Sequence, residues 1–278
     1  MLAAVRQQFI VDEVNRIGAV KVDELTRVLS VSDMTVRRDL DALARRGLLS
    51  KVYGGAVALG RSSTDEPGFE RKSARAQIEK EAIGTVASEL VEPGGAIAIT
   101  AGTTTWTVAR YLVNIPNLTI VTNSIRILQV LQEHDRTDLT VILTGGVRTP
   151  SDAFVGPLAV AAIRSLHVDL VIMGVHGLDL EAGLTTPNLL EAETNRAFVA
   201  SAKRLVVVAD HTKFGVVGLG QIAPLSSVDT LITDDRIDRQ ARDALSQAVP
   251  GLVLAPVEEH HAEDEHHAEE EHHAEHMP

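Results

Sequence analysis

The sequence predicts an α/β protein with two domains, an N-terminal winged helix-turn-helix and a C-terminal doubly wound domain built on a mainly parallel sheet. Three observations lead to this prediction. Residues 1–60 combine three helical apolar patterns with a hairpin pattern. Residues 77–257 repeat an apolar run, a Gly or Asn loop and a helix. Residues 61–76 between them are polar, show no period and are expected to be a linker.

The expected elements of the first domain follow from apolar spacing and punctuation. Val5, Phe9 and Val14 recur near helical spacing before Gly18. Asp23 has the side chain of a helix N-cap. These signals predict helices over residues 2–17, 23–29 and 32–47, followed by a hairpin over residues 48–59 around Gly54.

The third expected helix has one apolar face and one basic face. At 100° per residue, Val36, Leu40 and Leu43 cluster on the side that must meet a small core. The opposite arc would meet the major groove of DNA, where arginine clamps phosphates or pairs with guanine. A solvated basic face is the alternative, but two preceding helices and a hairpin favour DNA. The candidate DNA-binding residues are Ser32, Met34, Thr35, Arg37, Arg38, Arg45 and Lys51.

The formal net charge of −12 is unevenly distributed along the 278 residues. Residues 1–60 hold nine Lys or Arg against seven Asp or Glu (+2), residues 61–257 hold 17 against 22 (−5), and residues 258–278 hold none against nine (−9). The acidity therefore belongs mainly to the tail and does not argue against a DNA-binding first domain.

Composition also excludes several classes of site. The chain has no cysteine, which excludes disulfides, thiolate metal sites and cysteine nucleophiles. No apolar run approaches the roughly 20 residues that span a bilayer, so no membrane association is expected. Charges begin at Arg6, unlike a secretory signal, and a cytoplasmic location is expected.

The second domain contains six expected strands. Five of them are apolar runs with little alternation, which is typical of parallel strands covered on both faces. They cover residues 96–100, 118–122, 139–144, 170–174, 205–209 and 230–233.

Polar residues follow these strands at the sheet edge where ligands of doubly wound proteins bind. The turn from Gly102 to Thr105 opens a helix, which suits a phosphate, although N-capping by threonine explains it equally well. An ordinary turn is the alternative for each other loop. Together they offer cations for a phosphate and acceptors for hydroxyls. The candidate ligand-binding residues here are Gly102, Thr103, Thr104, Thr105, Asn123, Arg148, His176, Asp179 and Lys213.

The first domain resembles the DeoR family of bacterial transcriptional regulators. The resemblance rests on residues 22–25, the run from Val31 to Leu40, then 47–49 and 53–56. It implies that residues 1 to about 58 bind an operator. A single recognition helix contacts one half-site, so a dimer or tetramer is expected.

The second domain also resembles the family's sensor domain, which is related to ribose-5-phosphate isomerase and sugar-phosphate deaminases. The matching segments are residues 101–105, 121–124, 145–148, 155–157, 183–187, 191–192 and 209–215. The resemblance adds Glu191 to the candidate ligand-binding residues and implies a repressor that responds to a phosphorylated sugar. The chain departs from the family pattern at Thr100-Ala101, where one carboxylate and one hydroxyl are missing, at His176 and at Asn195. Either the preferred sugar differs or effector binding is weaker, and the sequence leaves this open.

Two alternatives accompany this prediction. His176, Asp179 and Glu191 could supply an acid and a base for an aldose–ketose isomerisation, but they form no complete catalytic set, so we expect neither an enzyme nor a cofactor.

The second alternative is a metal-responsive regulator acting through the tail, residues 258–278, which holds seven of the 11 histidines. Without apolar residues the tail is expected to be disordered, and adjacent histidines favour adventitious metal binding over a dedicated site. The operator, the regulated genes and the sign of regulation lie outside the sequence.

Overall fold

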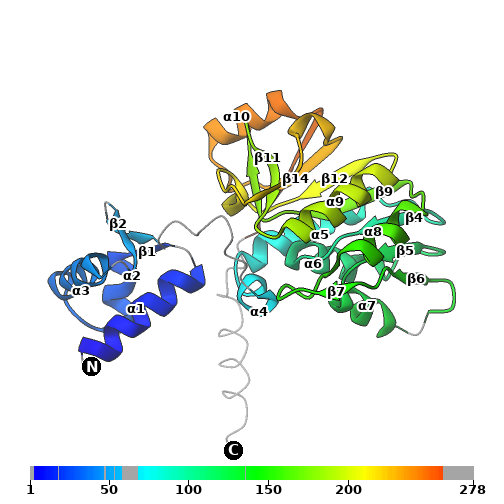
Figure 1. Cartoon of the computed structure of the whole chain (residues 1–278). Helices are drawn as coiled ribbons and strands as arrows, with labels where there is room; N and C mark the ends of the chain where they lie inside the picture. The colour runs from blue at the N-terminus through cyan, green and yellow to red at the C-terminus, as the bar shows by residue number, and fades with distance from the viewer. Residues whose placement is uncertain are drawn as a thin grey trace, which may run out of the picture.

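A computed structural model describes residues 3–17, 19–46, 48–52, 54–57, 68–134 and 136–258. Figure 1 shows helices and a small sheet in the N-terminal part of the chain and a larger α/β domain formed by the later residues. The predictions for residues 61–67 of the linker and for the tail from residue 259 onward fall outside the described residues.

The first domain is a three-helix unit with a three-stranded antiparallel sheet in the order β1-β3-β2. The predicted hairpin is confirmed, and its partner β1 was not predicted. Gly55 is required there because a Cβ would lie 2.0 Å from the carbonyl oxygen of Val20 on β1. The elements are α1 (Ala3–Ile17), β1 (Ala19–Lys21), α2 (Val22–Leu29), α3 (Asp33–Arg45), β2 (Ser50–Val52) and β3 (Gly55–Val57).

Helix α3 packs into this domain as its sequence predicts. Val36, Leu40 and Leu43 are buried in one core with Ile10 and Val14 of α1. A buried ion pair between Arg6 and Asp39 joins α1 to α3 beside that core. Helix α3 is therefore fixed on a packed support with its opposite face turned outward.

The second domain contains a seven-stranded sheet in which every pairing is parallel. All six predicted strands are present, and the edge strand β15 is an addition. In order across the sheet the strands are β15 (Gly251–Ala255), β14 (Thr230–Asp234), β12 (Leu205–Val208), β9 (Leu170–Gly174), β4 (Ala96–Ile99), β5 (Thr119–Thr122) and β6 (Thr140–Leu143).

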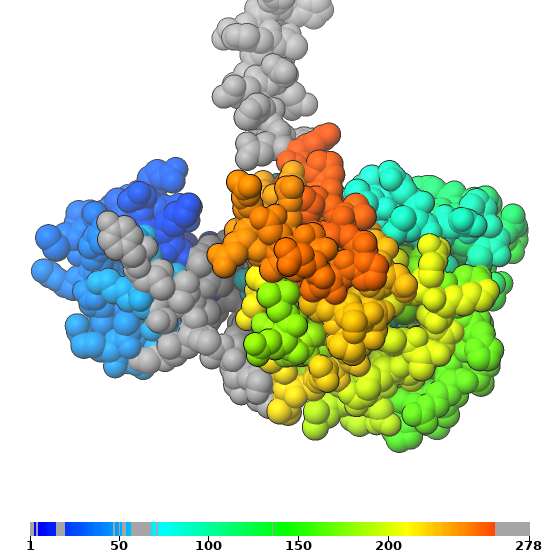
Figure 2. Space-filling model, turned by 90° about the horizontal axis from the view of Figure 1, so that it is seen from above, coloured from blue at the N-terminus to red at the C-terminus, as the bar shows by residue number. Residues whose placement is uncertain are grey.

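Helices cover both faces of the sheet, so the doubly wound prediction is confirmed (Figure 1). Ile97 and Ile99 of β4 join a core formed with α5, α6 and α7, whereas Ala98 joins the core formed with α8, α9 and α10. The helices are α5 (Gln77–Ser88), α6 (Thr103–Leu112), α7 (Ile125–Gln132), α8 (Pro157–Arg164), α9 (Leu189–Ser201) and α10 (Arg239–Ala248). In Figure 2, α10 and its C-terminal neighbours, in orange, form the surface nearest the viewer.

Smaller elements decorate the carboxyl edge of the sheet. A short helix lies inside the range 61–76 that the sequence predicted as a linker, and it packs against α6. Two small antiparallel sheets and a 3-10 turn over His211–Lys213 follow later strands. These elements are α4 (Phe69–Ser73), β7 (Val147–Arg148), β8 (Phe154–Val155), β10 (Gly177–Asp179), β11 (Gly183–Thr186) and β13 (Gly220–Ala223).

Candidate functional site

A pocket opens where the strand order of the large sheet reverses. Strands β5 and β6 lie on one side of β4, whereas β9, which is the next strand of this sheet along the chain, lies on the other side. The loops after β4 and β9 diverge at this point and leave the crevice in which doubly wound proteins bind ligands. The pocket is lined by Phe69, Lys72, Ala101, Gly102, Thr103, Thr104, Ser151, Gly174, Val175, His176, Thr186, Glu191, Asn195, Lys213 and Ile222.

The amino end of α6 forms one wall of this pocket. Gly102 is the N-cap and supplies no side-chain acceptor to the first turn. The first N–H groups of the helix and its partial positive charge therefore remain available to an anion. A Cβ at Gly102 would lie 2.9 Å from Thr105 Oγ1, so this close turn requires glycine.

A carboxylate forms another wall. Glu191, in the first turn of α9, accepts hydrogen bonds from Thr149 Oγ1 at 3.2 Å and Ser151 Oγ at 2.5 Å through its Oε1. Its Oε2 accepts from Thr186 Oγ1 at 2.9 Å. These three hydroxyls hold the carboxylate on the pocket wall, where an acceptor-only group is suited to a ligand hydroxyl that competes with them.

Two cations line the pocket as well, Lys213 after β12 and Lys72 on α4. Lys213 acts on the buried carboxylate of Asp210. Burial raises the pKa of Asp210, but the charge of Lys213 and a hydrogen bond from Thr212 outweigh burial and leave that pKa below its usual value. The loop after β12 therefore carries a buried negative charge on Asp210 and a positive charge on Lys213, which lines the pocket.

His211 in the same turn serves the fold. Its Nδ1 lies 2.7 Å from Asp234 Oδ1, and its backbone N–H donates to Asp234 Oδ2. The hydrogen bond to Asp234 raises the pKa of His211. This contact joins the ends of β12 and β14.

The structure brings six of the ten predicted ligand-binding residues to the pocket lining. They are Gly102, Thr103, Thr104, His176, Glu191 and Lys213. They come from the start of α6, the loops after β9 and β12 and the start of α9, which are distant in sequence.

The other four predicted residues hold loops together. Thr105 is fully buried and donates to the carbonyl of Gly102. The buried Asn123 side chain accepts from Ala101 N at 2.8 Å and donates to Phe154 O at 3.0 Å. Asp179 accepts from the N–H groups of residues 181 and 182 in the β10–β11 turn.

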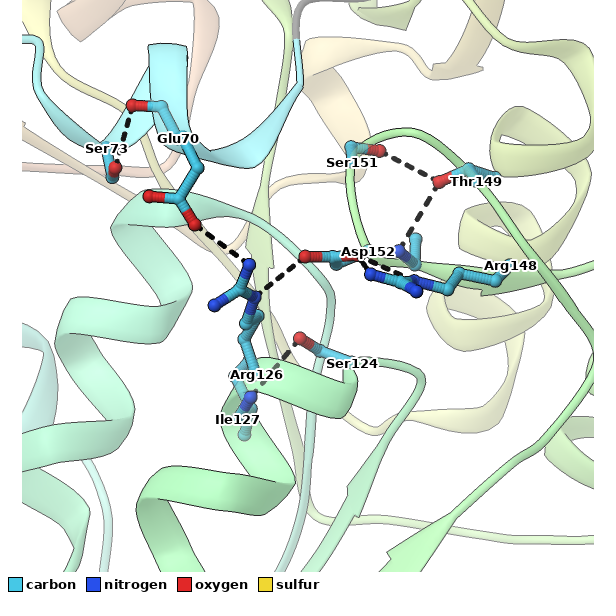
Figure 3. A network of polar contacts seen from close by, with 10 residues as sticks. Glu70, Ser73, Ser124, Arg126, Ile127, Arg148, Thr149, Ser151 and Asp152 are labelled. Atoms are coloured by element: carbon cyan, nitrogen blue, oxygen red, sulfur yellow. Dashed lines mark hydrogen bonds and ion pairs between the residues drawn. The ribbon is translucent and has the colours of Figure 1, made fainter.

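Arg148 is the fourth, and it belongs to a polar network beside the pocket (Figure 3). Asp152 accepts from Arg148 Nε at 2.7 Å and from Arg126 Nε at 2.7 Å. Arg126 also donates to Glu70 of α4 at 2.8 Å. The network therefore joins α4, α7 and the loop that carries Thr149 and Ser151.

Several lining residues were absent from the sequence-predicted set. Phe69 and Lys72 lie in a polar stretch that shows no helical period, so no sequence pattern identifies them. Thr186 ends a strand that was not predicted, and Ser151 lies in the loop between β7 and β8. The Thr-Thr pair at 185–186 was the available signal.

The predicted DNA-binding residues lie on or beside α3. Met34, Arg38 and Arg45 are exposed, and within the described residues neither arginine has a hydrogen bond or ion pair. Arg37 pairs with Asp33 at 2.6 Å, and Lys51 of β2 pairs with Asp41 at 2.6 Å.

The other two predicted residues form the start of the helix. Ser32 is its N-cap and accepts from Thr35 N at 3.3 Å. Their side-chain oxygens also lie 2.9 Å apart. Six of the seven predicted residues therefore lie at the start of α3 or along it, and Lys51 lies on the neighbouring strand β2.

The described residue ranges contain neither a membrane-spanning helix nor a clustered metal-binding group. No helix within them is long and apolar enough to cross a membrane. Nor do they bring together three or more histidine or carboxylate side chains in a metal-binding group. The His-rich tail, on which the metal-responsive alternative rests, lies outside these ranges.

Comparison with known families gives two matches in this chain. The model of the DeoR-like helix-turn-helix domain matches residues 6–61, and that of the DeoR C terminal sensor domain matches residues 75–235.

Full-length relatives agree with these matches. The HTH-type transcriptional regulator YgbI of Escherichia coli strain K12 is 36% identical over 93% of this chain and 100% of its own length. The glycerol-3-phosphate regulon repressor of the same strain is 34% identical over 82% of this chain and 90% of its own.

Among solved structures, ribose 5 phosphate isomerase A of Neisseria gonorrhoeae is 17% identical with a TM-score of 0.36, over 51% of this chain and 54% of its own.

Proposed function

The chain belongs to the DeoR family of transcriptional regulators, and we propose that it is a repressor that releases operator DNA when a phosphorylated sugar occupies its pocket. One observation carries the ligand assignment. The open amino end of α6 and Lys213 share one pocket with Glu191. A molecule with an anionic group at one end and hydroxyls at the other matches this pocket.

The phosphate end is assigned to the wall formed by Gly102, Thr103 and Thr104. Backbone N–H groups and the threonine hydroxyls donate to phosphate oxygens, and Lys213 balances their charge. The hydroxyl end is assigned to Glu191 and Thr186, with His176 and Asn195 completing the lining. Neutral sugars lack the phosphate and should bind weakly.

The DNA assignment rests on the exposed face of α3. Arg38 and Arg45 project from the side opposite the buried Leu40. In helix-turn-helix proteins this face enters the major groove. Because one recognition helix reads one half-site, we propose that at least two copies bind the operator together.

The sign of regulation is inferred from a relative. The protein that is 34% identical over 82% of this chain is named a glycerol-3-phosphate regulon repressor. We therefore propose repression here, with loss of DNA affinity as the response to the sugar phosphate. Binding without turnover is proposed too, because the family relatives are named as regulators.

The DNA proposal is tested by selecting sequences from a random duplex library with the full-length protein. We expect a two-fold symmetric sequence to be enriched, and Arg38→Ala to weaken its binding by about 1–3 kcal/mol, measured by fluorescence anisotropy. Arg204→Ala, which removes an exposed arginine of the sensor domain, is the matched control. Equal affinity for both variants would remove Arg38 from the interface.

The ligand proposal is tested with ribose 5-phosphate, fructose 6-phosphate, glucose 6-phosphate and glycerol 3-phosphate. At least one should change the emission of Trp106, which is the single tryptophan and lies on α6, and should weaken DNA binding. Lys213→Met should weaken this response about tenfold or more, since it removes a charge-assisted contact. Lys203→Met, at an exposed lysine paired with Asp169, should behave as the wild type.

Turnover is tested on the same mixtures. Phosphorus NMR of sugar phosphates kept with the protein should show no new signal. A new sugar phosphate that appears in proportion to protein would favour the isomerase-like alternative.

A further inference from the structure

Helix α4 belongs to the pocket although it lies between the two family matches. The matches end at residue 61 and begin again at residue 75, whereas α4 covers Phe69–Ser73. Phe69 and Lys72 both line the pocket. Residues 58–67 separate β3 of the DNA-binding domain from Gly68, so α4 is the described part of the sensor nearest to that domain along the chain.

Three side chains from other helices hold α4 in place, those of Trp106, Arg126 and Lys80. The Phe69 ring packs edge-on against Trp106 of α6, with ring centres 5.9 Å apart. The Arg126 guanidinium lies 4.9 Å from the centre of the Phe69 ring and donates to Glu70. Lys80 Nζ donates to the carbonyl oxygens of Lys72 and Arg75 at the end of α4.

The contact with Lys80 is buried. The Lys80 residue is 3% exposed, and burial lowers its pKa to about 8. Both carbonyls belong to the last turn of α4 and the two residues after it. The C-terminal end of α4 is thereby tied to the start of α5, while Arg126 ties its N-terminal end to α7.

A continuous chain of polar contacts runs from the pocket to α4. Glu191 accepts from Thr149 and Ser151, which lie in the same loop as Asp152. Asp152 accepts from Arg126, and Arg126 donates in turn to Glu70 (Figure 3). A sugar hydroxyl that hydrogen-bonds to Glu191 competes with the two loop hydroxyls and thereby acts on the loop.

We propose that α4 carries the state of the pocket to the DNA-binding domain and that Arg126 is the positioning residue that couples α4 to the ligand-contacting loop. This inference rests on the function proposed above. A ligand shifts a conformational equilibrium only through contacts that differ between the two states. Lys72 of α4 lines the pocket and so can reach a bound phosphate directly, whereas Arg126 couples α4 to the pocket indirectly through Asp152.

The test uses the full-length protein, the selected duplex, and an equimolar mixture of ribose 5-phosphate, fructose 6-phosphate, glucose 6-phosphate and glycerol 3-phosphate as the probe. The readout is the ratio of the DNA dissociation constants with and without the mixture. Coupling ratios of about 5–150 are typical of such systems. Arg126→Gln should lower this ratio below about twofold while the mixture still raises the thermal unfolding temperature as in the wild type.

Arg110→Gln is the matched control. Arg110 also pairs with a glutamate, Glu81 at 2.6 Å, and also lies over an aromatic ring, that of Trp106 at 5.4 Å. It does not contact the loop of Asp152, so Arg110→Gln should keep the wild-type ratio. Arg126→Lys should restore part of the ratio because it keeps the charge near Asp152.

Glu70→Lys protects the test against loss of folding. The Glu70 side chain pairs with Arg126 and is 77% exposed, so its substitution leaves the core intact. The new lysine places a second positive charge beside Arg126. It should lower the ratio as Arg126→Gln does. Wild-type ratios in both variants would overturn the inference, as would loss of sugar-phosphate binding in Arg126→Gln. A wild-type protein that ignores the mixture would instead overturn the proposed function itself.

Discussion

At the residue scale, Asn123 illustrates how a polar side chain at a strand end serves the fold. Its amide is 2% exposed and bridges the loop after β4 to β8. Asn123→Ala should lower the free energy of unfolding by about 1 kcal/mol or more, because it removes the side-chain partner of two partly buried backbone groups. Chemical denaturation measures this loss.

The control is Asn114→Ala, at an exposed asparagine just beyond α6. It should stay within about 0.5 kcal/mol of the wild type. A small effect of Asn123→Ala on stability together with weaker sugar-phosphate binding would return Asn123 to the group of ligand contacts.

His211 is expected to make stability depend on pH. Its folded pKa is raised by Asp234, so the contact stabilises the fold fully below the unfolded value of about 6.5 and loses this contribution as pH rises through the folded pKa. His211→Gln does not titrate and should show a smaller loss of unfolding free energy from mildly acidic to mildly alkaline pH. Denaturation at a series of pH values measures both proteins, and parallel curves would contradict the prediction.

The sequence predicts which residue types follow the strands, but the role of each residue depends on where its side chain points. Thr104 and Thr105 are neighbours, yet one lines the pocket and the other is fully buried against the carbonyl of Gly102. Arg148 has the right charge for a phosphate, but Asp152 lies within reach through a turn with a positive φ of 61°. Such local pairings depend on loop geometry, which periodicity does not encode.

At the scale of elements, variants at the N-cap of α3 should distinguish an effect on helix stability from an effect on DNA binding. Ser32 Oγ accepts from Thr35 N. Ser32→Ala should destabilise the helix by about 1 kcal/mol, and Ser32→Asp should keep the cap. Hydrogen exchange of the α3 amides measures the difference, because local stability sets their protection.

The affinity for DNA should rank the two Ser32 variants differently from the stability of the helix. Ser32→Asp places a carboxylate at the proposed interface and should bind the selected duplex more weakly than the wild type. If Ser32→Asp bound DNA normally, Ser32 would be a structural residue alone.

The elements themselves were largely predictable. Each parallel strand is a short apolar run before a polar loop, and burial on both faces imposes that pattern. In α1, Val5 shares the helical apolar spacing but is 56% exposed, and the core contains Ile10 and Val14. Arg6, paired with Asp39, is also buried on the inner face of α1. A charged residue breaks the apolar spacing, so the spacing alone does not identify this face.

Strand β15 and helix α4 escaped prediction for related reasons. Strand β15 lies at the edge of the sheet, where four of its five residues are only partly buried. The five residues of α4 are too few to show a period, and their helix is stabilised by contacts with α6 and α7. Tertiary packing decides both.

At the scale of the whole molecule, the acidic tail should weaken DNA binding at low salt. Residues 258–278 hold nine acidic residues and no basic ones, so removing them changes the net charge from −12 to −3. The truncated protein should bind the selected duplex more tightly at low salt. The difference should disappear as the Debye length falls to about 8 Å near physiological ionic strength.

Zinc distinguishes the metal-responsive alternative in the same assay. Since the proposed effector site lies among residues 69–222, added Zn²⁺ should leave the DNA affinity of both proteins unchanged. A zinc response that is lost on truncation would favour regulation through the tail.

The position of α4 bears on the construction of chimeric biosensors. A designer who joins a foreign DNA-binding domain at residue 75, where the match to the sensor domain begins, would discard Phe69 and Lys72 together with the partner of Arg126. The hybrid would still recognise its new promoter but would report its metabolite poorly. A junction before Gly68 keeps the signalling segment with the pocket and leaves the choice of promoter to the grafted domain.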